Sequence, residues 1–297
     1  MFNSTIDFLF RVYRIIGRLI IKYSFNPRPA SYPFISGDGF RKLADYIYDN
    51  RTKNVAVDKI KEKDIIFVGD SNIKKFLTEF HPKIKVPYIL ITHNGDEAIG
   101  DELAGLIDEK IIKWYGLNVI VNHPKVIPLP IGIANRHYYV GGILWVFRWV
   151  MKKNYPKKDR IFYGFMVETN FQERQPAFQV LKSNPLAETV MQWIIYPRYL
   201  HLLAKYKFVA SPPGSSVEGH RTWDAMYLKT IPIVKGSITT EYFKKLNIPV
   251  WVVDDWNELV GLTGTDLAKK YNDIMAQADW SKIFMNYWKN EILKLKD

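Results

Sequence analysis

The sequence contains no cysteine, and this absence excludes several classes of protein. Without thiols the chain cannot form a disulfide scaffold, a zinc–thiolate site, an iron–sulfur cluster or a thiol nucleophile. It also lacks an uncharged apolar run of about 18 residues, so no transmembrane helix is expected. The N-terminus has neither a clean apolar stretch nor an Ala-x-Ala-like cleavage site, and we therefore expect a cytoplasmic protein.

Acidic residues are outnumbered by basic ones, with 30 Asp and Glu against 42 Lys and Arg in 297 residues, a net charge of +12. The hydrophobic content of 47% excludes a disordered chain. The positive balance favours a polyanionic partner, which leaves nucleic acid, an anionic membrane surface or a phosphorylated small molecule. No recognised nucleic-acid-binding module is visible, so nucleic acid is the least favoured of the three.

Short β-branched runs alternate with helical patterns, which is typical of parallel α/β units. The alternation runs twice, and we place a domain boundary in the Lys- and Pro-rich stretch 154–160, giving domains 1–157 and 158–297. Strands are expected at 65–68, 88–92, 119–121, 126–131, 161–165, 208–211, 231–234 and 250–253. Helices are expected at 40–50, 73–80, 102–114, 143–153, 172–182, 197–206, 218–228 and 239–246.

Residues 1–23 hold an amphipathic helix. Charged residues recur every three or four positions and gather on one stripe: Asp7, Arg11, Arg14, Arg18 and Lys22. The opposite face is broad and apolar: Phe8, Leu9, Val12, Ile15, Ile16, Leu19 and Ile20. Two interpretations stay open, a helix docked on its own domain and an in-plane anchor that makes the protein peripheral to an anionic membrane.

Residues 280–295 repeat apolar side chains at helical spacing, and many of these are aromatic. We expect a closing helix here that crosses back over a large partner surface.

Ligands of open α/β sheets bind beyond the carboxyl ends of the strands, so residues that directly follow strands are the first site candidates. Four segments qualify: 70–71, 93–97, 164–174 and 211–216. The last runs from a strand through a Pro-Pro-Gly-Ser-Ser turn into a helix expected to begin near Val217. Backbone N–H groups of Gly214, Ser215 and Ser216 at such a helix start predict an anion site without a metal.

Two charged residues on the following helix extend this prediction. Arg221 offers a planar fork for phosphate oxygens, and Asp224, on the same helical face, is suited to ribose hydroxyls. The alternative is that the two side chains only pair with each other. Their joint position after a strand favours a phosphorylated nucleotide.

The region 208–236 resembles the signature region of exostosin-like glycosyltransferases. The residues that carry the resemblance are Phe208, Pro212, Gly214, Arg221, Asp224, Ala225 and the run 231–234. The family usually has Glu at the position of Asp224. The resemblance implies a GT-B fold, in which two Rossmann-like domains face a cleft and the C-terminal one binds a nucleotide-sugar, usually a UDP-sugar. It also implies that Arg174 reaches the donor diphosphate, with a solvated helix arginine as the alternative. His220 is a weaker candidate for contact with the base, with a packing role as the alternative.

A metal site is not indicated. Asp254 and Asp255 follow a strand, but adjacent side chains diverge and no histidine is near in sequence, so the pair is expected to cap the helix that begins at Trp256. Arg221 and a helix N-terminus are able to stabilise a departing nucleoside diphosphate, and we expect neither a metal nor another cofactor.

The sequence thus predicts a glycosyltransferase that moves a sugar from a nucleotide donor to a hydroxyl of a glycan acceptor, inverting by the resemblance. A retaining transferase of the same fold and an inactive carbohydrate- or nucleotide-binding module remain as alternatives. Transfer needs a general base from the acceptor domain. Asp96 is the first candidate because Gly95 permits the turn that aims it over the strand ends; His93 is the second and Glu97 the third.

Overall fold

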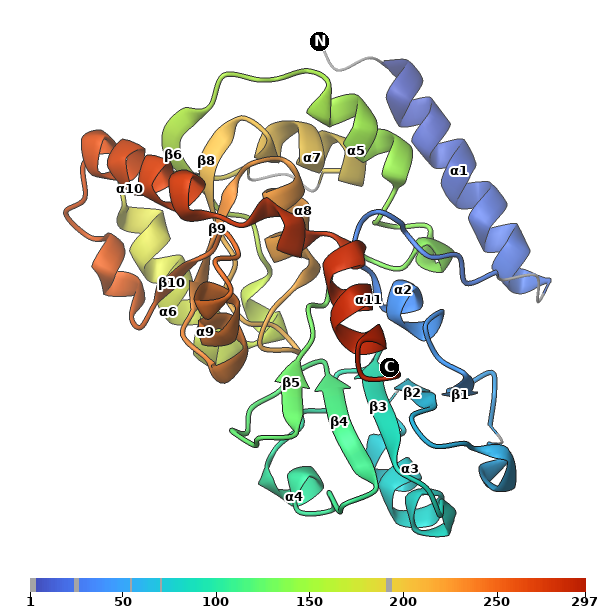
Figure 1. Cartoon of the computed structure of the whole chain (residues 1–297). Coiled ribbons are helices and arrows are strands. Elements are labelled where there is room, and N and C mark those ends of the chain that lie inside the picture. The colour runs from blue at the N-terminus through green and yellow to red at the C-terminus, as the bar shows by residue number, and fades with distance from the viewer. Residues whose placement is uncertain (1–3, 24–26, 54, 70, 191–193) are drawn as a thin grey trace.

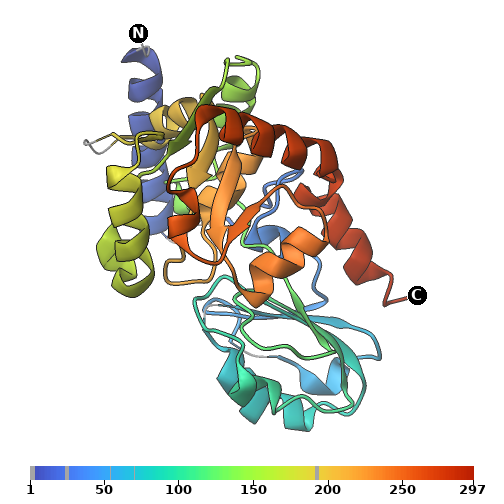
Figure 2. The ribbon, with the colours of Figure 1, turned by 90° about the vertical axis from the view of Figure 1, so that its left-hand side faces the viewer.

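The carboxyl ends of two parallel sheets face each other across the middle of the molecule (Figures 1 and 2). The structure is a computed structural model that describes residues 4–23, 27–53, 55–69, 71–190 and 194–297, with Ser4 and Ile6 described by their backbone only. Within these residues the strands form two sheets of five strands each. Asp70, one of the residues expected to follow a strand in a site, lies outside the described residues.

The first sheet has the strands in sequence order. Its strands are β1 (Tyr46–Tyr48), β2 (Ile65–Gly69), β3 (Tyr88–His93), β4 (Ile111–Gly116) and β5 (Val126–Pro128), with helices α2 (Gly37–Arg41), α3 (Ile73–Glu79) and α4 (Asp101–Ala104) around them. Every residue of β2 and of β3 is buried. Such continuous apolar strands are what a parallel sheet covered on both faces requires.

The second sheet has the strand order β10-β9-β8-β6-β7. Its strands are β6 (Lys158–Phe162), β7 (Ala187–Glu188), β8 (Tyr206–Ala210), β9 (Ile231–Lys235) and β10 (Trp251–Val253). The helices of this half are α6 (Phe171–Ser183), α7 (Tyr196–Leu203), α8 (His220–Tyr227), α9 (Ile238–Lys245) and α10 (Gly264–Gln277).

Two of the expected helices are wrong in the first half. The pattern over 40–50 divides into the short α2 and the edge strand β1, whose Tyr46–Tyr48 backbone pairs with β2. The pattern over 102–114 ends as helix at Ala104, and residues from Ile111 onward form β4 between β3 and β5. In both places pairing with a neighbouring strand overrides a helical spacing of apolar residues.

One expected strand is also wrong. Residues 119–121 form only an isolated bridge, between Val119 and Ile99. The strand of this region is instead β4, in which the buried Trp114 donates from its indole to the Thr92 hydroxyl at 2.9 Å.

Two helices from the first half of the chain pack on the second domain. Helix α5 (Leu144–Met151) contacts α7, with the ring of Phe147 6.2 Å from that of Tyr196. Helix α1 (Ser4–Lys22) also contacts α7, where Arg198 pairs with Asp7. The boundary at 157 stays a prediction, and these contacts add α1 and α5 to the layer of helices on the second sheet.

The C-terminal segment joins the two domains. After the turn η6 (Trp280–Ile283), helix α11 (Met285–Leu293) passes between them (Figure 1). The Tyr115 hydroxyl of β4 donates to the Glu291 carbonyl at 3.3 Å, and Lys296 pairs with Asp45 at 2.6 Å. The predicted fold class is confirmed: two α/β domains with parallel sheets, an N-terminal amphipathic helix and a C-terminal closing helix.

In the part of the chain that the structure describes, no helix is both long enough and apolar enough to cross a bilayer.

Candidate functional site

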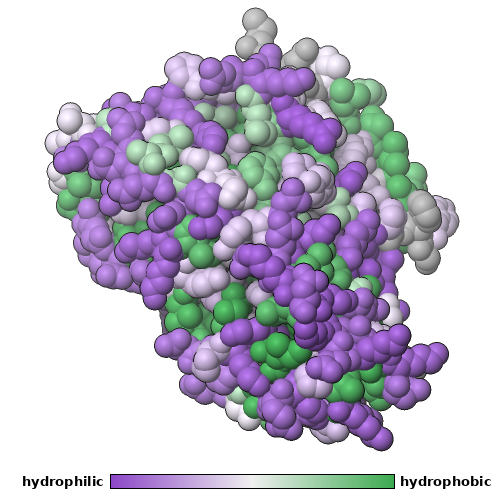
Figure 3. Space-filling view, in the orientation of Figure 1, coloured by the Kyte–Doolittle hydropathy of each residue, from purple (hydrophilic) through white to green (hydrophobic). Residues whose placement is uncertain are grey.

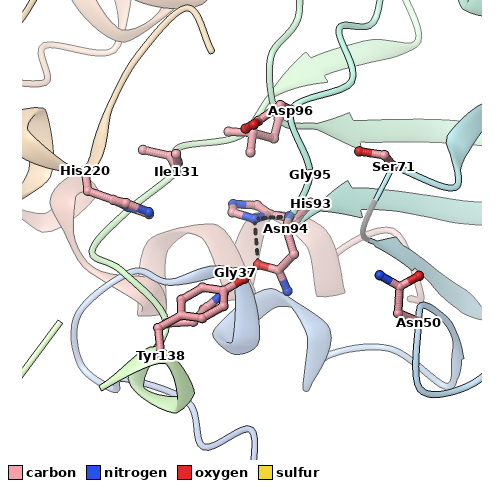
Figure 4. A pocket seen from close by; sticks show the side chains of 12 residues that line it. Gly37, Asn50, Ser71, His93, Asn94, Gly95, Asp96, Ile131, Tyr138 and His220 are labelled. Carbon is pink, nitrogen blue, oxygen red and sulfur yellow. Dashed lines mark hydrogen bonds between the residues drawn. The ribbon is translucent and has the colours of Figure 1, made fainter. Parts of the chain in front are cut away.

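Two cavities lie where the strand ends of the two sheets meet. The first, which we call the His93 cavity, has a volume of about 390 Å³ (Figure 4). Most of its lining comes from the first domain, and His220 enters from the second. The lining residues are Gly37, Asn50, Ser71, His93, Asn94, Gly95, Asp96, Leu117, Ile131, Asn135, Tyr138 and His220.

The second cavity, which we call the Gly214 cavity, has a volume of about 330 Å³ and is shared by both domains. The first domain contributes Ala98, Asn118 and Ile120. The second contributes Asn170, Glu173, the turn 213–217, and residues 235–237 at the end of β9.

Asp96 and Ser216 connect the two cavities. The Ser216 hydroxyl donates to Asp96 Oδ1 at 3.3 Å, and each of these residues lines one of the two spaces. Asn118 holds the junction together, since its side chain donates to the Asp96 carbonyl at 2.9 Å and accepts from the Val217 amide at 2.9 Å. A ligand that fills the Gly214 cavity therefore lies next to one that fills the His93 cavity.

The His93 side chain has both ring nitrogens engaged. Nδ1 accepts from the Asn94 amide at 2.8 Å, so Nε2 carries the proton and donates to the Pro130 carbonyl at 3.1 Å. Burial lowers the pKa of His93 to about 4, and the ring is neutral at pH 7. The lone pair that a general base needs is already in use.

The two carboxylates of this segment differ in their surroundings. Asp96 is exposed at the cavity rim, and its second oxygen has no hydrogen bond within the described residues. Glu97 accepts from the amides of Ile73 at 3.0 Å and Lys74 at 3.4 Å. Glu97 therefore caps the first turn of α3, whereas Asp96 is open to a ligand.

His220 lies in the His93 cavity and not on the donor side where the base contact was expected. Its Nδ1 donates to the Gly132 carbonyl at 2.8 Å, which leaves the lone pair on Nε2. Figure 4 shows the ring directed from the second domain toward the interior of the cavity. Burial lowers the pKa of His220, while the hydrogen bond to the Gly132 carbonyl and, to a smaller extent, the charge of the Asp96 carboxylate oppose this shift.

Arg174 and Arg221 both lie near the Phe165 ring, with their guanidinium carbons 5.9 and 6.0 Å from its centroid. Arg174 donates to the carbonyls of Pro213 at 2.7 Å and Met166 at 2.8 Å. Arg221 donates to the Gly164 carbonyl at 2.5 Å.

Neither arginine has a carboxylate within salt-bridge distance in the described residues, and the buried Nε of Arg221 has no partner there. Burial first, and then the charge of Arg221, lower the pKa of Arg174. Arg174 thus places a positive charge beside the Gly214 turn, and the Arg221 guanidinium, which is close enough to repel it, is opposed by the charge of the buried Asp224 carboxylate.

The turn after β8 differs from the expected helix start. Helix α8 begins at His220 and not near Val217, and the amide of Gly214 is bonded within the turn to the Ser216 carbonyl at 2.9 Å. Of the three amides predicted to bind an anion, that of Gly214 is therefore engaged within the turn, whereas those of Ser215 and Ser216 have no hydrogen bond within the described residues. Arg174 lies so close to Gly214 that a Cβ there would meet its guanidinium at 2.6 Å and displace the end of that side chain.

Asp224 lies behind the site. It is 4% exposed, accepts from the Tyr196 hydroxyl at 2.9 Å and lines neither cavity. Burial raises its pKa to about 7. No ion pair joins it to Arg221 among the described residues, so the alternative of a simple Arg221–Asp224 pair does not hold in this structure.

The polar floor of the His93 cavity was missed in the sequence. Asn135 donates to Asn94 at 2.7 Å and accepts from the Asp38 amide at 2.8 Å. The buried Asp38 also accepts from Arg28 at 2.9 Å and lies 2.6 Å from the ring of His137, and these contacts hold its pKa down against the effect of burial. In the sequence, the one residue that could have indicated this polar network was Asn94, which lies in the segment 93–97 that follows a predicted strand.

Glu218 was also missed, and it ties the two domains together. It is 2% exposed, and its carboxylate accepts from the Ile131 amide at 2.6 Å and from the Trp223 indole at 2.7 Å. Burial raises its pKa to about 8.

Among the residues that the structure describes, no three His, Asp or Glu side chains are grouped to hold a metal ion. Asp255 accepts from the Asn257 amide at 2.7 Å and caps the turn η5 (Trp256–Leu259), as predicted. Independence from metal stays a prediction.

Comparison with known proteins gives structural matches only. No protein-family model and no curated protein matches the chain, so membership of the exostosin-like family is not shown. The α,α-trehalose-phosphate synthase (UDP-forming) of Burkholderia vietnamiensis matches with a TM-score of 0.49 and 7% identity, over 87% of this chain and 76% of that chain.

Two further matches are of the same kind. The apo structure of OtsA has a TM-score of 0.47 and 8% identity, over 100% of this chain and 79% of that chain. The UDP-forming synthase of Burkholderia xenovorans has a TM-score of 0.42 and 9% identity, over 88% and 78%. Likeness at this level supports no conclusion about activity or substrate.

The architecture follows from the geometry of the chain itself. Two α/β domains direct the carboxyl ends of their parallel strands at adjoining cavities, and a C-terminal helix crosses back from the second domain to the first. This is the GT-B fold.

Proposed function

We propose that the protein is a glycosyltransferase that moves a sugar from a nucleotide donor, a UDP-sugar, to a hydroxyl of a glycan acceptor. The observation that carries the proposal is the pair Arg174 and Arg221, neither of which has a carboxylate within salt-bridge distance in the described residues. Neither side chain lines the Gly214 cavity itself, but Arg174 donates to the Pro213 carbonyl of the turn that does. Two buried or half-buried cations without a carboxylate partner are costly unless an anion binds them. A diphosphate supplies two such charges and matches the planar forks of arginine.

The His93 cavity is suited to the acceptor. Its lining offers amides, hydroxyls and one exposed aromatic ring, that of Tyr138, and none of the described lining residues is a lysine or arginine. Neutral hydrogen-bonding groups and an aromatic edge fit sugar hydroxyls and their apolar ring faces. The cavity adjoins the proposed donor site at the Asp96–Ser216 contact, where the two substrates would meet.

In the proposed reaction the acceptor oxygen attacks the anomeric carbon of the donor sugar. A new carbon–oxygen bond forms as the bond to the diphosphate oxygen breaks, and the configuration inverts. The hydroxyl proton passes to Asp96, whose free oxygen lies at the junction of the cavities. The charge that develops on the leaving diphosphate is stabilised by the two arginines, which is electrostatic catalysis by fixed cations.

His220 is the second candidate for the base. Its Nε2 lone pair is unoccupied within the described residues, and the ring is directed into the cavity (Figure 4). A neutral imidazole in this position accepts a proton as readily as a carboxylate does. The two candidates differ in what their removal does to the pH profile.

A thermal-shift panel of UDP-, GDP-, CMP- and dTDP-sugars tests the donor class, because a ligand that binds only the folded state raises the melting temperature. We expect UDP-sugars to give the largest shift. If none of the four classes raises the melting temperature, the proposed donor site is wrong. If a nucleotide-sugar bound but the protein neither released UDP from it nor transferred the sugar, the protein would be an inactive binding module.

The base is tested with the donor that gives the largest shift. Asp96→Asn should keep donor affinity and lower turnover by about two to four orders of magnitude. Glu97→Gln is the matched control, and its turnover should stay within about threefold of the wild type, because Glu97 caps a helix. A different result would assign the role of base to His220. In that case Asp96→Asn would keep near-normal turnover, whereas His220→Gln would lose turnover and would also lose the fall in rate below pH 6.5 in the pH–rate profile.

A further inference from the structure

Helix α1 presents three different faces around its axis. Successive residues are turned by about 100°, which places each of its side chains in one of three sectors. One sector packs on the protein, one is apolar and open to solvent, and one is basic. None of this is needed for the proposed transferase site, which lies elsewhere in the molecule.

The docking sector is narrow. Phe10 is 2% exposed, Tyr13 packs its ring 5.3 Å from that of Tyr139, and Gly17 lies directly against the Tyr139 side chain. A Cβ at Gly17 would meet that ring at 2.2 Å, so the close approach requires glycine. Asp7 pairs with Arg198 of α7 and fixes one end of the helix. The helix is thus docked on its own molecule, but not through the broad apolar face.

The broad apolar face points away from the protein. Phe8 is 64% exposed, Ile15 57% and Ile16 52%, and Leu9 and Leu19 are each 49% exposed. These residues cover about 120° of the helix circumference over about 12 residues. Hydrophobic atoms gather along the upper right edge of the molecule, where Figure 1 has α1 (Figure 3). Apolar surface of this continuity on a folded protein marks a binding surface.

The basic sector lies directly beside the apolar one. Arg11, Arg18 and Lys22 are exposed, and within the described residues none of them is paired with a carboxylate. Positive side chains that flank an apolar helical face are placed where lipid headgroups lie when the apolar face enters the acyl region. Each cation near an anionic surface adds about 1 kcal/mol of attraction.

We propose that α1 lies in the plane of an anionic lipid bilayer, with Phe8, Ile15 and Leu19 in the outer acyl region and Arg11, Arg18 and Lys22 at the phosphates. The Phe10–Tyr13–Gly17 face stays docked, so the membrane holds the whole GT-B body at a fixed distance. A second copy of the chain is a poorer occupant, because an antiparallel pair of such helices packed apolar face to apolar face brings the basic stripes together, and a parallel pair leaves both stripes without an anionic partner.

The test is co-sedimentation of the full chain with vesicles of 70% phosphatidylcholine and 30% phosphatidylserine, at low and at physiological salt. We expect binding that weakens with salt, and weaker binding to pure phosphatidylcholine. Ile15→Glu with Leu19→Glu should reduce binding at least about tenfold. Both side chains are exposed, so the fold is not at risk. Val260→Glu is the matched control, because Val260 is 62% exposed on another part of the surface.

The basic stripe is tested by Arg11→Gln, Arg18→Gln and Lys22→Gln together, against a control with the same loss of charge at exposed lysines elsewhere: Lys59→Gln, Lys85→Gln and Lys289→Gln. The first triple variant should lose most of the anionic selectivity and the second little of it. If both triple variants lost anionic selectivity equally, net charge alone would explain the effect, and the proposed orientation of α1 on the bilayer would be wrong. No co-sedimentation of the wild type, or self-association that Ile15→Glu with Leu19→Glu abolishes without vesicles, would overturn the lipid assignment.

Discussion

Replacement of Arg221 by methionine should separate ligand binding from stability. In the folded protein Arg221 gains one hydrogen bond, to the Gly164 carbonyl at 2.5 Å, and has a buried Nε without a partner in the described residues. Because each guanidinium lies about 6 Å from the same Phe165 centroid, Arg221 and Arg174 are at most about 12 Å apart. At an effective dielectric constant of about 20 their repulsion is therefore at least about 1 kcal/mol.

The two effects on stability nearly cancel. Loss of the hydrogen bond costs about 1 kcal/mol, and removal of the repulsion returns a similar amount. The melting temperature without ligand should therefore stay within about 2 °C of the wild type. A hydrogen bond to a charged group contributes about 1.5–3 kcal/mol, so the affinity for UDP should fall about 10- to 150-fold.

The measurements are calorimetric titration with UDP and a thermal melt without ligand. Arg148→Met is the control, because Arg148 is exposed on α5 and has no contact with Arg174, Phe165 or the Gly214 turn among the described residues. It should change neither quantity. Unchanged UDP affinity in Arg221→Met would remove this side chain from the donor site, and a melting temperature lower by 5 °C or more would make its role structural.

Two further predictions concern the frame of the site. Gly37→Ala should destabilise the protein by about 2 kcal/mol or more in denaturant unfolding, because the new Cβ would meet Asn94 Oδ1 at 1.8 Å. Gly219→Ala is the control, because no atom lies within 4 Å of a Cβ at that position. This control should change the free energy of unfolding by less than about 1 kcal/mol. Burial raises the pKa of Glu218 to about 8, so the folded state binds its proton more tightly than the unfolded state does. Its contribution to stability is therefore present at about pH 4 and is lost as the pH rises to about 8, at up to about 1.4 kcal/mol per pH unit. Glu218→Gln should flatten the pH profile of the free energy of unfolding between pH 5 and 8, and an unchanged slope would contradict the raised pKa.

The sequence by itself determined the parallel α/β class and most strands of both sheets. Run 65–68 is apolar at every position and run 88–92 at every position but Thr92, a pattern that suits a strand covered on both faces. The segments after those strands were identified for the same reason, since topology sends their side chains to one edge. The amphipathic helix over 5–23 was also predictable from the sequence, because the spacing of charged and apolar residues along one helix does not depend on contacts with distant residues.

Tertiary structure decided which residues lie together at that edge. Tyr46–Tyr48 and Ile111–Gly116 became strands because neighbouring strands offered their hydrogen bonds, and no local pattern contains that partner. Likewise, only the packed molecule brings His220 across to the His93 cavity and buries Asp224 behind Tyr196.

The faces of α1 show the same division. The sequence defined an apolar face and a basic stripe, but it did not show that the helix docks through Phe10 and Gly17 and leaves the apolar face open. That choice depends on the ring of Tyr139, more than a hundred residues away in the chain. Local spacing fixes what each face is made of, whereas the contacts of distant residues fix which face is buried.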